Sequence, residues 1–143
     1  MKHIMLYEGF FDIFQNKILD LVKAITDFIN IVEPELKLNY VKKHKVYFIN
    51  QTKKEIYLNI EKDQYDKEFI KVSLYNNLSR IIKDFLMDIN NLNEDVVYGD
   101  IDDSIWFETY EININNIDEY ISLLTIENYN AFRKKITSKK FNL

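Results

Sequence analysis

The spacing of apolar residues predicts an α+β protein with a mainly antiparallel sheet of four to five strands. In several segments apolar residues recur every three or four positions, which is the spacing of an amphipathic helix. In the segments between them apolar residues alternate with other residues, which is the spacing of a strand. The predicted order is a long helix, three strands, a second helix, two strands and short C-terminal helices, an order typical of the α+β class.

The first predicted element is a long amphipathic helix over residues 10–32. Gly9 is expected to open it. Pro34 ends it, because proline lacks an amide hydrogen and crowds the residue before it. The apolar stripe of this helix comprises Phe11, Phe14, Ile18, Leu21, Val22, Ile25, Phe28, Ile29 and Val32.

Strands are predicted at residues 46–49, 56–60 and 70–74, where the period changes to two. The polar residues 50–54 predict a hairpin between the first two strands. Residues 36–41 are expected to add a short strand at the edge of the sheet. One face, beneath the helices, is expected to carry Ile56, Leu58, Ile60, Ile70, Val72 and Leu74. The other face would carry Tyr57, Phe69, Lys71 and Tyr75.

A second amphipathic helix is predicted over residues 78–89. Strands at 96–98 and 105–114 should follow it, flanking an acidic loop at 99–104. Two short C-terminal helices are predicted, at residues 117–124 and 126–136. The chain of 143 residues contains no repeat or low-complexity linker and has the usual size of one domain. Residues 1–143 are therefore expected to form a single globular domain.

Composition excludes several classes of function. The chain has no cysteine, which excludes disulfides, a thiolate nucleophile and cysteine-bound zinc, and its two glycines cannot form a glycine-rich phosphate loop. A net charge of −4 disfavours a general nucleic-acid binder. Glu8, Gly9 and Asp12 interrupt the apolar start of the chain, so we expect neither a signal peptide nor a membrane span. The expected partner is another protein, and the expected location is the cytoplasm of a bacterial host or a virion.

The stretch Ile4-Met5-Leu6-Tyr7-Glu8-Gly9-Phe10 resembles the opening of many small proteins encoded by tailed phages. In those proteins a hydrophobic-x-Leu-aromatic-Glu-x-Phe pattern recurs. The abundance of Lys, Ile, Asn, Tyr and Phe is also typical of an AT-rich genome. The resemblance implies a protein encoded by a phage or another mobile element.

Leu6-Tyr7-Glu8 also matches the Leu/Ile-x-Glu pattern that prohead proteases of some large phages cut, and so does Ile31-Val32-Glu33. The alternative, which we favour, is that the first stretch is only the start of the long helix. The order of elements is similar to that of the type III secretion chaperones, which are small, acidic and dimeric. That resemblance implies, as a second hypothesis, a chaperone-like homodimer.

The best candidate for metal chemistry is the acidic loop with Asp100, Asp102 and Asp103, because hard cations prefer clustered carboxylates. A solvated turn is the alternative interpretation, and we expect no metal and no cofactor. His3 and His44 have no neighbouring groups in the sequence that would make either one a general base. A divalent-metal enzyme that uses this loop stays a third hypothesis.

The leading hypothesis is a non-enzymatic protein that binds another protein, as a virion or assembly component or as an inhibitor of a host defence factor. The segment 105–110 is apolar on both sides, so it either lies at the centre of the sheet or presents one face to another chain. Tyrosine and tryptophan are favoured anchors in interfaces, because they bury a large area and keep a polar tip. The expected contact residues are Tyr57, Tyr75, Trp106 and Tyr110.

Overall fold

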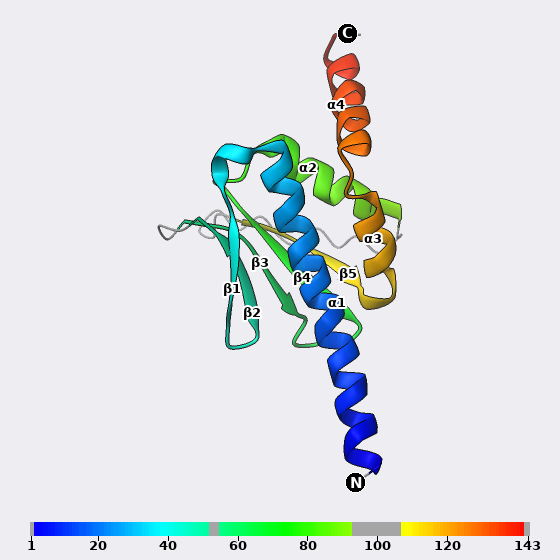
Figure 1. Cartoon of the computed structure of the whole chain (residues 1–143). Helices are drawn as coiled ribbons and strands as arrows, with labels where there is room; N and C mark the ends of the chain where they lie inside the picture. The colour runs from blue at the N-terminus through cyan, green and yellow to red at the C-terminus, as the bar shows by residue number, and fades with distance from the viewer. Residues whose placement is uncertain (1, 52–54, 93–106, 142–143) are drawn as a thin grey trace.

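The computed structural model describes residues 2–51, 55–92 and 107–141, and within these ranges it leaves out the side chains of 2–15, 91, 92, 107 and 139–141. Helix α1 (Lys2–Val32) crosses one face of an antiparallel five-stranded sheet (Figure 1). The strands are β1 (Asn39–Lys43), β2 (Val46–Asn50), β3 (Ile56–Lys62), β4 (Phe69–Tyr75) and β5 (Phe107–Asn113). The other helices are α2 (Arg80–Asp88), α3 (Ile117–Leu123) and α4 (Ile126–Phe141). The predicted α+β class is confirmed.

The strands follow one another across the sheet in the order of the sequence, so β1 and β5 are the outermost of the described strands. Helix α2 lies in the sequence between β4 and β5, which are nevertheless neighbours in the sheet. Arg80 at the start of α2 makes two hydrogen bonds to the carboxylate of Glu108 on β5, at 2.6 and 2.9 Å. This ion pair anchors α2 to the edge strand.

The core lies between the helices and one side of the sheet, here called the inner face. That face carries Ile49, Leu58, Ile60, Ile70, Val72, Leu74, Tyr110 and Ile112, and all eight are inaccessible to solvent. Strand pairing brings these residues together, with Leu58 opposite Leu74 and Val72 opposite Tyr110. The predicted inner-face residues are confirmed as buried except Ile56, which is half-buried. Sealing one side of an antiparallel sheet in this way explains the period of two in the sequence.

Helix α1 supplies the other half of the core with the stripe predicted from its period. Ile18, Leu21, Val22, Ile25, Phe28 and Ile29 are buried, and Val32 is half-buried. Phe11 and Phe14, also predicted for this stripe, lie outside the described side chains. Phe28 then joins rings from two other helices, Phe85 on α2 with Tyr129 and Phe132 on α4.

The helix α1 begins earlier than predicted, at Lys2 instead of residue 10. Gly9 lies within it, because one glycine in a helix interior costs about 1 kcal/mol but does not end the helix. The stretch Leu6-Tyr7-Glu8 is thus helical backbone. At the other end the prediction is confirmed: α1 ends at Val32, and Pro34 begins a short 3₁₀ helix.

The predicted edge strand at 36–41 is displaced toward the hairpin and spans Asn39–Lys43. Leu36 belongs to the 3₁₀ helix, and Lys37 adopts a left-handed backbone with φ of 48°, so an extended strand cannot begin before them. His44, in the tight turn to β2, also has a positive φ, of 58°.

Other boundaries differ by a few residues. Helix α2 begins at Arg80 instead of residue 78, because Ser79 has the extended backbone of an N-cap residue. Helix α4 continues to Phe141, beyond the predicted end at 136. The predicted strand at 96–98 and the acidic loop at 99–104 lie outside the described residues. In the part of the chain that is described, no helix combines the length and apolar character needed to cross a bilayer.

Candidate functional site

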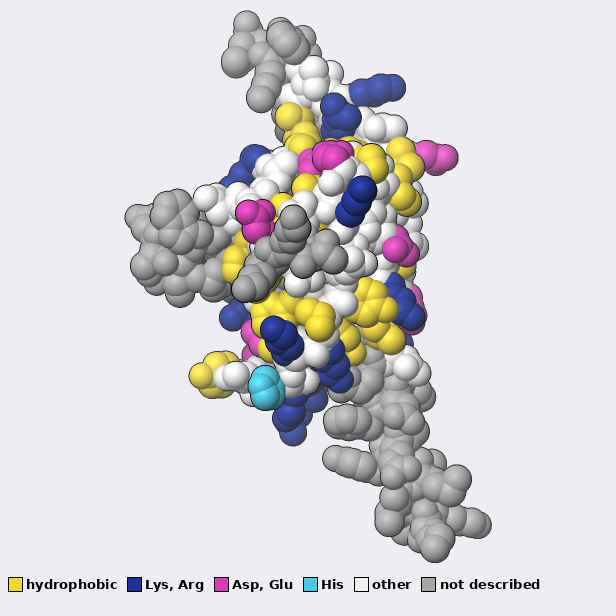
Figure 2. Space-filling model, turned by 60° about the vertical axis from the view of Figure 1, so that its left-hand side comes forward, with side chains coloured by type: hydrophobic (Ala, Val, Ile, Leu, Met, Phe, Trp, Pro, Cys, Tyr) yellow, Lys and Arg dark blue, Asp and Glu magenta, His cyan; other side chains and the backbone are white. Residues whose placement is uncertain are grey.

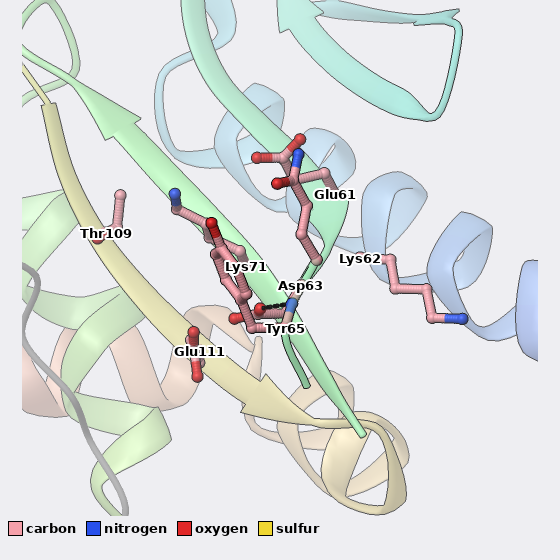
Figure 3. Close-up of a pocket in the computed structure, with 8 residues that line it drawn as sticks. Glu61, Lys62, Asp63, Tyr65, Lys71, Thr109 and Glu111 are labelled. Atoms are coloured by element: carbon pink, nitrogen blue, oxygen red, sulfur yellow. Dashed lines mark hydrogen bonds between the residues drawn. The ribbon is translucent and has the colours of Figure 1, made fainter. Parts of the chain in front are cut away.

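The side of the sheet opposite the inner face is here called the open face. Figure 3 looks onto this face and shows helix α1 behind the sheet. The face carries Phe48, Asn59, Glu61, Phe69, Lys71, Ser73, Tyr75, Thr109 and Glu111. All of these except the buried Ser73 are half-buried, in contrast to the fully buried residues of the inner face. The open face is therefore the side of the sheet that can meet a ligand or a partner.

A pocket of about 340 Å³ opens on this face where β3 ends (Figure 3). Its walls come from the end of β3, the turn that follows, β4 and β5. The lining residues are Glu61, Lys62, Asp63, Gln64, Tyr65, Lys71, Thr109 and Glu111. Lys71 lies between two carboxylates, because strand pairing places it beside Glu61 on β3 and Glu111 on β5.

The carboxylate of Asp63 organises the turn between β3 and β4. Its Oδ1 accepts hydrogen bonds from the backbone N–H groups of Tyr65, at 2.8 Å, and Asp66, at 3.2 Å. Asp66 repeats the pattern by accepting a bond from the N–H of Glu68 at 3.1 Å. Aspartate favours such turns because its short side chain reaches the backbone two residues on. The turn is thus held in one shape, with Tyr65 at its tip.

Tyr65 is the most exposed large ring in the described chain, with 97% of its surface open to solvent. Such exposure is unusual for tyrosine, which normally buries most of its ring. The hydrogen bond from its own N–H to Asp63 fixes the backbone that carries it. The ring therefore projects from an ordered turn at the rim of the pocket.

Asp63 and Glu111 form a hydrogen-bonded carboxyl pair inside the pocket. This bond raises the pKa of Glu111 to about 7, and burial and the negative charges of Asp63 and Asp66 act in the same direction, against Lys71. The same bond lowers the pKa of Asp63, helped by the N–H of Tyr65. The protonated Glu111 thus donates to an ionised Asp63, so that below about pH 7 the pair holds one proton.

The pair can exchange its proton for another positive group. An ammonium or guanidinium group that enters the pocket would meet two carboxylates once Glu111 has lost its proton. A carboxyl with a pKa near 7 is also suited to general acid–base chemistry, although such catalysis needs a reacting group positioned beside it. Within the described residues, no three side chains of the metal-binding types come together in a possible metal site.

Of the four predicted contact residues, the structure describes Tyr57, Tyr75 and Tyr110 and does not bring them together on one surface. Tyr75 lies on the open face, half-buried, and its hydroxyl accepts a hydrogen bond of 2.7 Å from Nδ2 of Asn59. Tyr57 is only 5% exposed and Tyr110 is fully buried, so both belong to the core. Trp106 lies outside the described residues, as do Asp100, Asp102 and Asp103.

Tyr57 and Tyr110 are buried where exposed side chains were expected, for two different reasons. Between β2 and β3 the register shifts at Ile49 and Asn50, so that Tyr57 has no partner on β2. Its side chain therefore does not follow the alternation of inner and open faces along the strand. Tyr110 faces inward because it pairs with Val72 on the inner face. A bulge and a pairing register are properties of two strands together, and a period within one strand does not predict them.

Asp63, Tyr65 and Glu111 were not predicted from the sequence. Asp63 could have been found as a turn residue, since Asp63 to Asp66 is a polar stretch between two strands. Its pairing with Glu111 has no local signal, because the two residues come from distant segments that only the sheet brings together.

Comparisons of the chain with models of protein families, with curated proteins and with solved structures found no match. The open face, with its pocket, its exposed tyrosine ring and its carboxyl pair, is therefore the feature of the molecule that bears on function.

The raised pKa of Glu111 predicts a dependence of stability on pH. Between about pH 4.5, its ordinary value, and pH 7, the native protein holds a proton that the unfolded chain has lost. The contribution of Glu111 to stability is therefore complete below this window and lost as the pH rises through it. Glu111→Gln should remove the loss and exceed the wild type in unfolding free energy at pH 8, by on the order of 1 kcal/mol after screening by solvent.

Urea unfolding at pH 5 and pH 8 measures this difference. The two proteins should be closer in stability at pH 5, because the amide of glutamine replaces the donor of the protonated acid. Asp63 contributes in the opposite sense, since its pKa is lowered, but its loss of stability comes at lower pH, outside this window. Glu119→Gln on the exposed surface of α3 is the control and should change neither value. If the difference in unfolding free energy between Glu111→Gln and the wild type were the same at both pH values, the shared proton would be contradicted.

Proposed function

We propose that the protein is a non-enzymatic protein-binding protein and that its partner docks on the open face of the sheet, around the pocket of Asp63 and Glu111. The observation that carries this proposal is the fully exposed ring of Tyr65, held by an ordered turn at the rim of that pocket. A rigid, exposed aromatic ring loses little conformational entropy when it is covered, which is why tyrosine is a favoured interface anchor.

The rest of the open face has the composition of an interface. Phe48, Phe69 and Tyr75 offer half-buried rings, and the hydroxyl of Tyr75 is already satisfied by Asn59. Interfaces commonly combine such rings with polar groups and a limited number of charges. The inner face, by contrast, is sealed by the protein's own helices.

The charge of the pocket indicates what the partner presents. The carboxyl groups of Glu61, Asp63 and Glu111 line it, with Lys62 and Lys71 as the cations. An arginine or lysine of the partner would pair with the Asp63–Glu111 carboxyls, and a guanidinium could also stack on the Tyr65 ring. Because the partner's cation takes the place of the shared proton, affinity should rise as the pH increases past the pKa of Glu111, about 7.

The source of the partner is proposed from the sequence. The phage-like opening and the AT-rich residue choice support a protein of a phage or mobile element, whose partner is a virion protein or a host factor. A chaperone-like homodimer is the alternative, in which the partner's basic side chain would come from a second copy of the chain.

Affinity capture from a bacterial lysate, with the wild type and two variants as bait, tests the proposal. Tyr65→Ala removes the exposed ring and should not affect folding, and Glu111→Lys places a positive charge in the pocket. Each variant is expected to weaken the binding of one and the same partner by about 2 kcal/mol, a typical hot-spot loss. Calorimetry with the purified partner gives the magnitude, and repeating it with Glu111→Gln from pH 6 to 8 tests the linkage to the proton.

Matched controls use exposed residues elsewhere. Ile126→Ala on α4 truncates another exposed apolar side chain, and Glu119→Lys on α3 makes the same change of charge. Both control variants should bind the partner with the same affinity as the wild type. The proposal fails if every captured protein binds Tyr65→Ala and Glu111→Lys as well as it binds the wild type. Sedimentation at increasing protein concentration tests the alternative of a homodimer. If the chain forms such a dimer, Tyr65→Ala and Glu111→Lys should each dissociate it.

A further inference from the structure

A second surface of the molecule, at the β1 edge of the sheet, has the properties of a binding strand. Among the described strands, β1 pairs only with β2, so that its other side carries no strand of the described sheet. Lys43 and Val46 are partners across a two-residue turn, and in a hairpin with such a turn this pair is the hydrogen-bonded one. Hydrogen-bonded pairs alternate along an antiparallel ladder, so Tyr40 and Lys42 direct their backbone N–H and C=O groups to the outer side. An unpaired row of this kind is a template on which an extended segment of another chain can form hydrogen bonds.

All five residues of β1 are exposed, and two of them are apolar. Tyr40 is 39% and Val41 is 38% exposed, and as neighbours in a strand they lie on opposite faces. An added strand would therefore find an apolar side chain beside it on each face. Asn39 and Lys43 complete the strand without proline or glycine, which would weaken pairing.

The edge is also the most basic part of the described sheet. Figure 2 shows lysine side chains gathered around the histidine at the tip of the β1–β2 hairpin. The chain contains no acidic residue between Glu35 and Glu55, although its net charge is −4. Lys42 lies over the ring of Tyr47, with 5.4 Å from its Nζ to the ring centre. The salt bridges among the described residues involve neither Lys43 nor Lys45.

The positive charges of these lysines determine which kind of segment can bind at the β1 edge. Lysine on an edge strand disfavours pairing with an identical strand, because like charges would then face each other. The same lysines favour a strand that carries glutamate or aspartate. A nucleic acid would match the charge but not the alternating donors and acceptors of the backbone, so the edge geometry favours a peptide.

We propose that β1 docks an extended, acidic segment of a partner protein, which joins the sheet beside Tyr40 and Val41 and places its carboxylates against the lysines of the β1–β2 hairpin. This surface is separate from the pocket of Asp63 and Glu111, and the inference stands whether or not the open face binds a partner.

The probe is a fluorescent peptide of roughly ten residues, the length of a long strand, in which glutamate alternates with valine. Fluorescence anisotropy measures its binding to the full chain. We expect saturable binding that Lys43→Glu/Lys45→Glu weakens about tenfold or more, because two attractive charges become repulsive. The control Lys134→Glu/Lys135→Glu reverses two exposed charges on α4 and should leave binding unchanged.

Three further probes test the kind of ligand on the unaltered protein. The same peptide with N-methyl groups on alternate residues cannot complete the backbone bonds and should lose binding, as should the peptide with lysine in place of glutamate. A single-stranded DNA of equal charge should bind more weakly. Absence of binding by the acidic peptide, equal binding by its N-methylated form, or tighter binding by the DNA would each overturn the proposal.

Discussion

Replacing Phe85 with alanine is expected to lower the free energy of unfolding by about 3–5 kcal/mol, the usual cost of deleting a buried ring. Phe85 is only 1% exposed and packs on three other rings. Its ring centre lies 5.2 Å from that of Phe28 on α1, and 5.3 and 5.6 Å from those of Tyr129 and Phe132 on α4. A cavity at this point would loosen α2 from both neighbouring helices at once.

Urea unfolding monitored by circular dichroism measures the Phe85→Ala effect. Phe69→Ala is the matched control, because it deletes the same ring from the half-buried open face. It should cost clearly less, since part of its surface already meets water. Equal losses in the two variants would show that the aromatic cluster of the helices contributes no more than the open face.

Tyr120→Phe is expected to cost about 1–3 kcal/mol, although it removes a single oxygen atom. The hydroxyl of Tyr120 on α3 donates to the backbone carbonyl of Leu86 on α2 at 3.0 Å. It lies 2.7 Å from the hydroxyl of Tyr110 on β5, and since the Tyr120 proton is already used, Tyr110 is the donor in that bond. Both tyrosines are buried, so Tyr120→Phe leaves a donor and an acceptor without this partner.

Tyr110→Phe separates the hydrogen-bond argument from simple packing. It removes the donor and leaves Tyr120 bonded to Leu86, so its expected cost is smaller, about 1 kcal/mol. The double variant should cost less than the sum of the two single ones, because the two hydroxyls share one bond. Equal single losses that add in the double variant would contradict this assignment of donor and acceptor.

Local periodicity was enough to predict the class of the fold and most of its core. The stripe from Ile18 to Ile29 and the alternation from Leu58 to Leu74 arise because one side of each element is sealed and the other is not. Such a pattern lies within one segment of sequence and is readable there. The ends of elements were less predictable, as at Gly9, because a weak helix breaker acts against the preferences of several neighbours.

The candidate site was decided by the tertiary structure alone. Asp63 follows β3 and Glu111 lies on β5, and the sheet brings the two together because both strands flank β4. The hydrogen bond between their carboxyls then shifts the pKa of both. The sequence by itself determined the α+β class and most of the buried faces, since each depends on residues close together in the chain. It could not determine that a bulge buries Tyr57 or that pairing with Val72 turns Tyr110 inward. Register between strands is a relation between distant segments, and only the folded sheet specifies it.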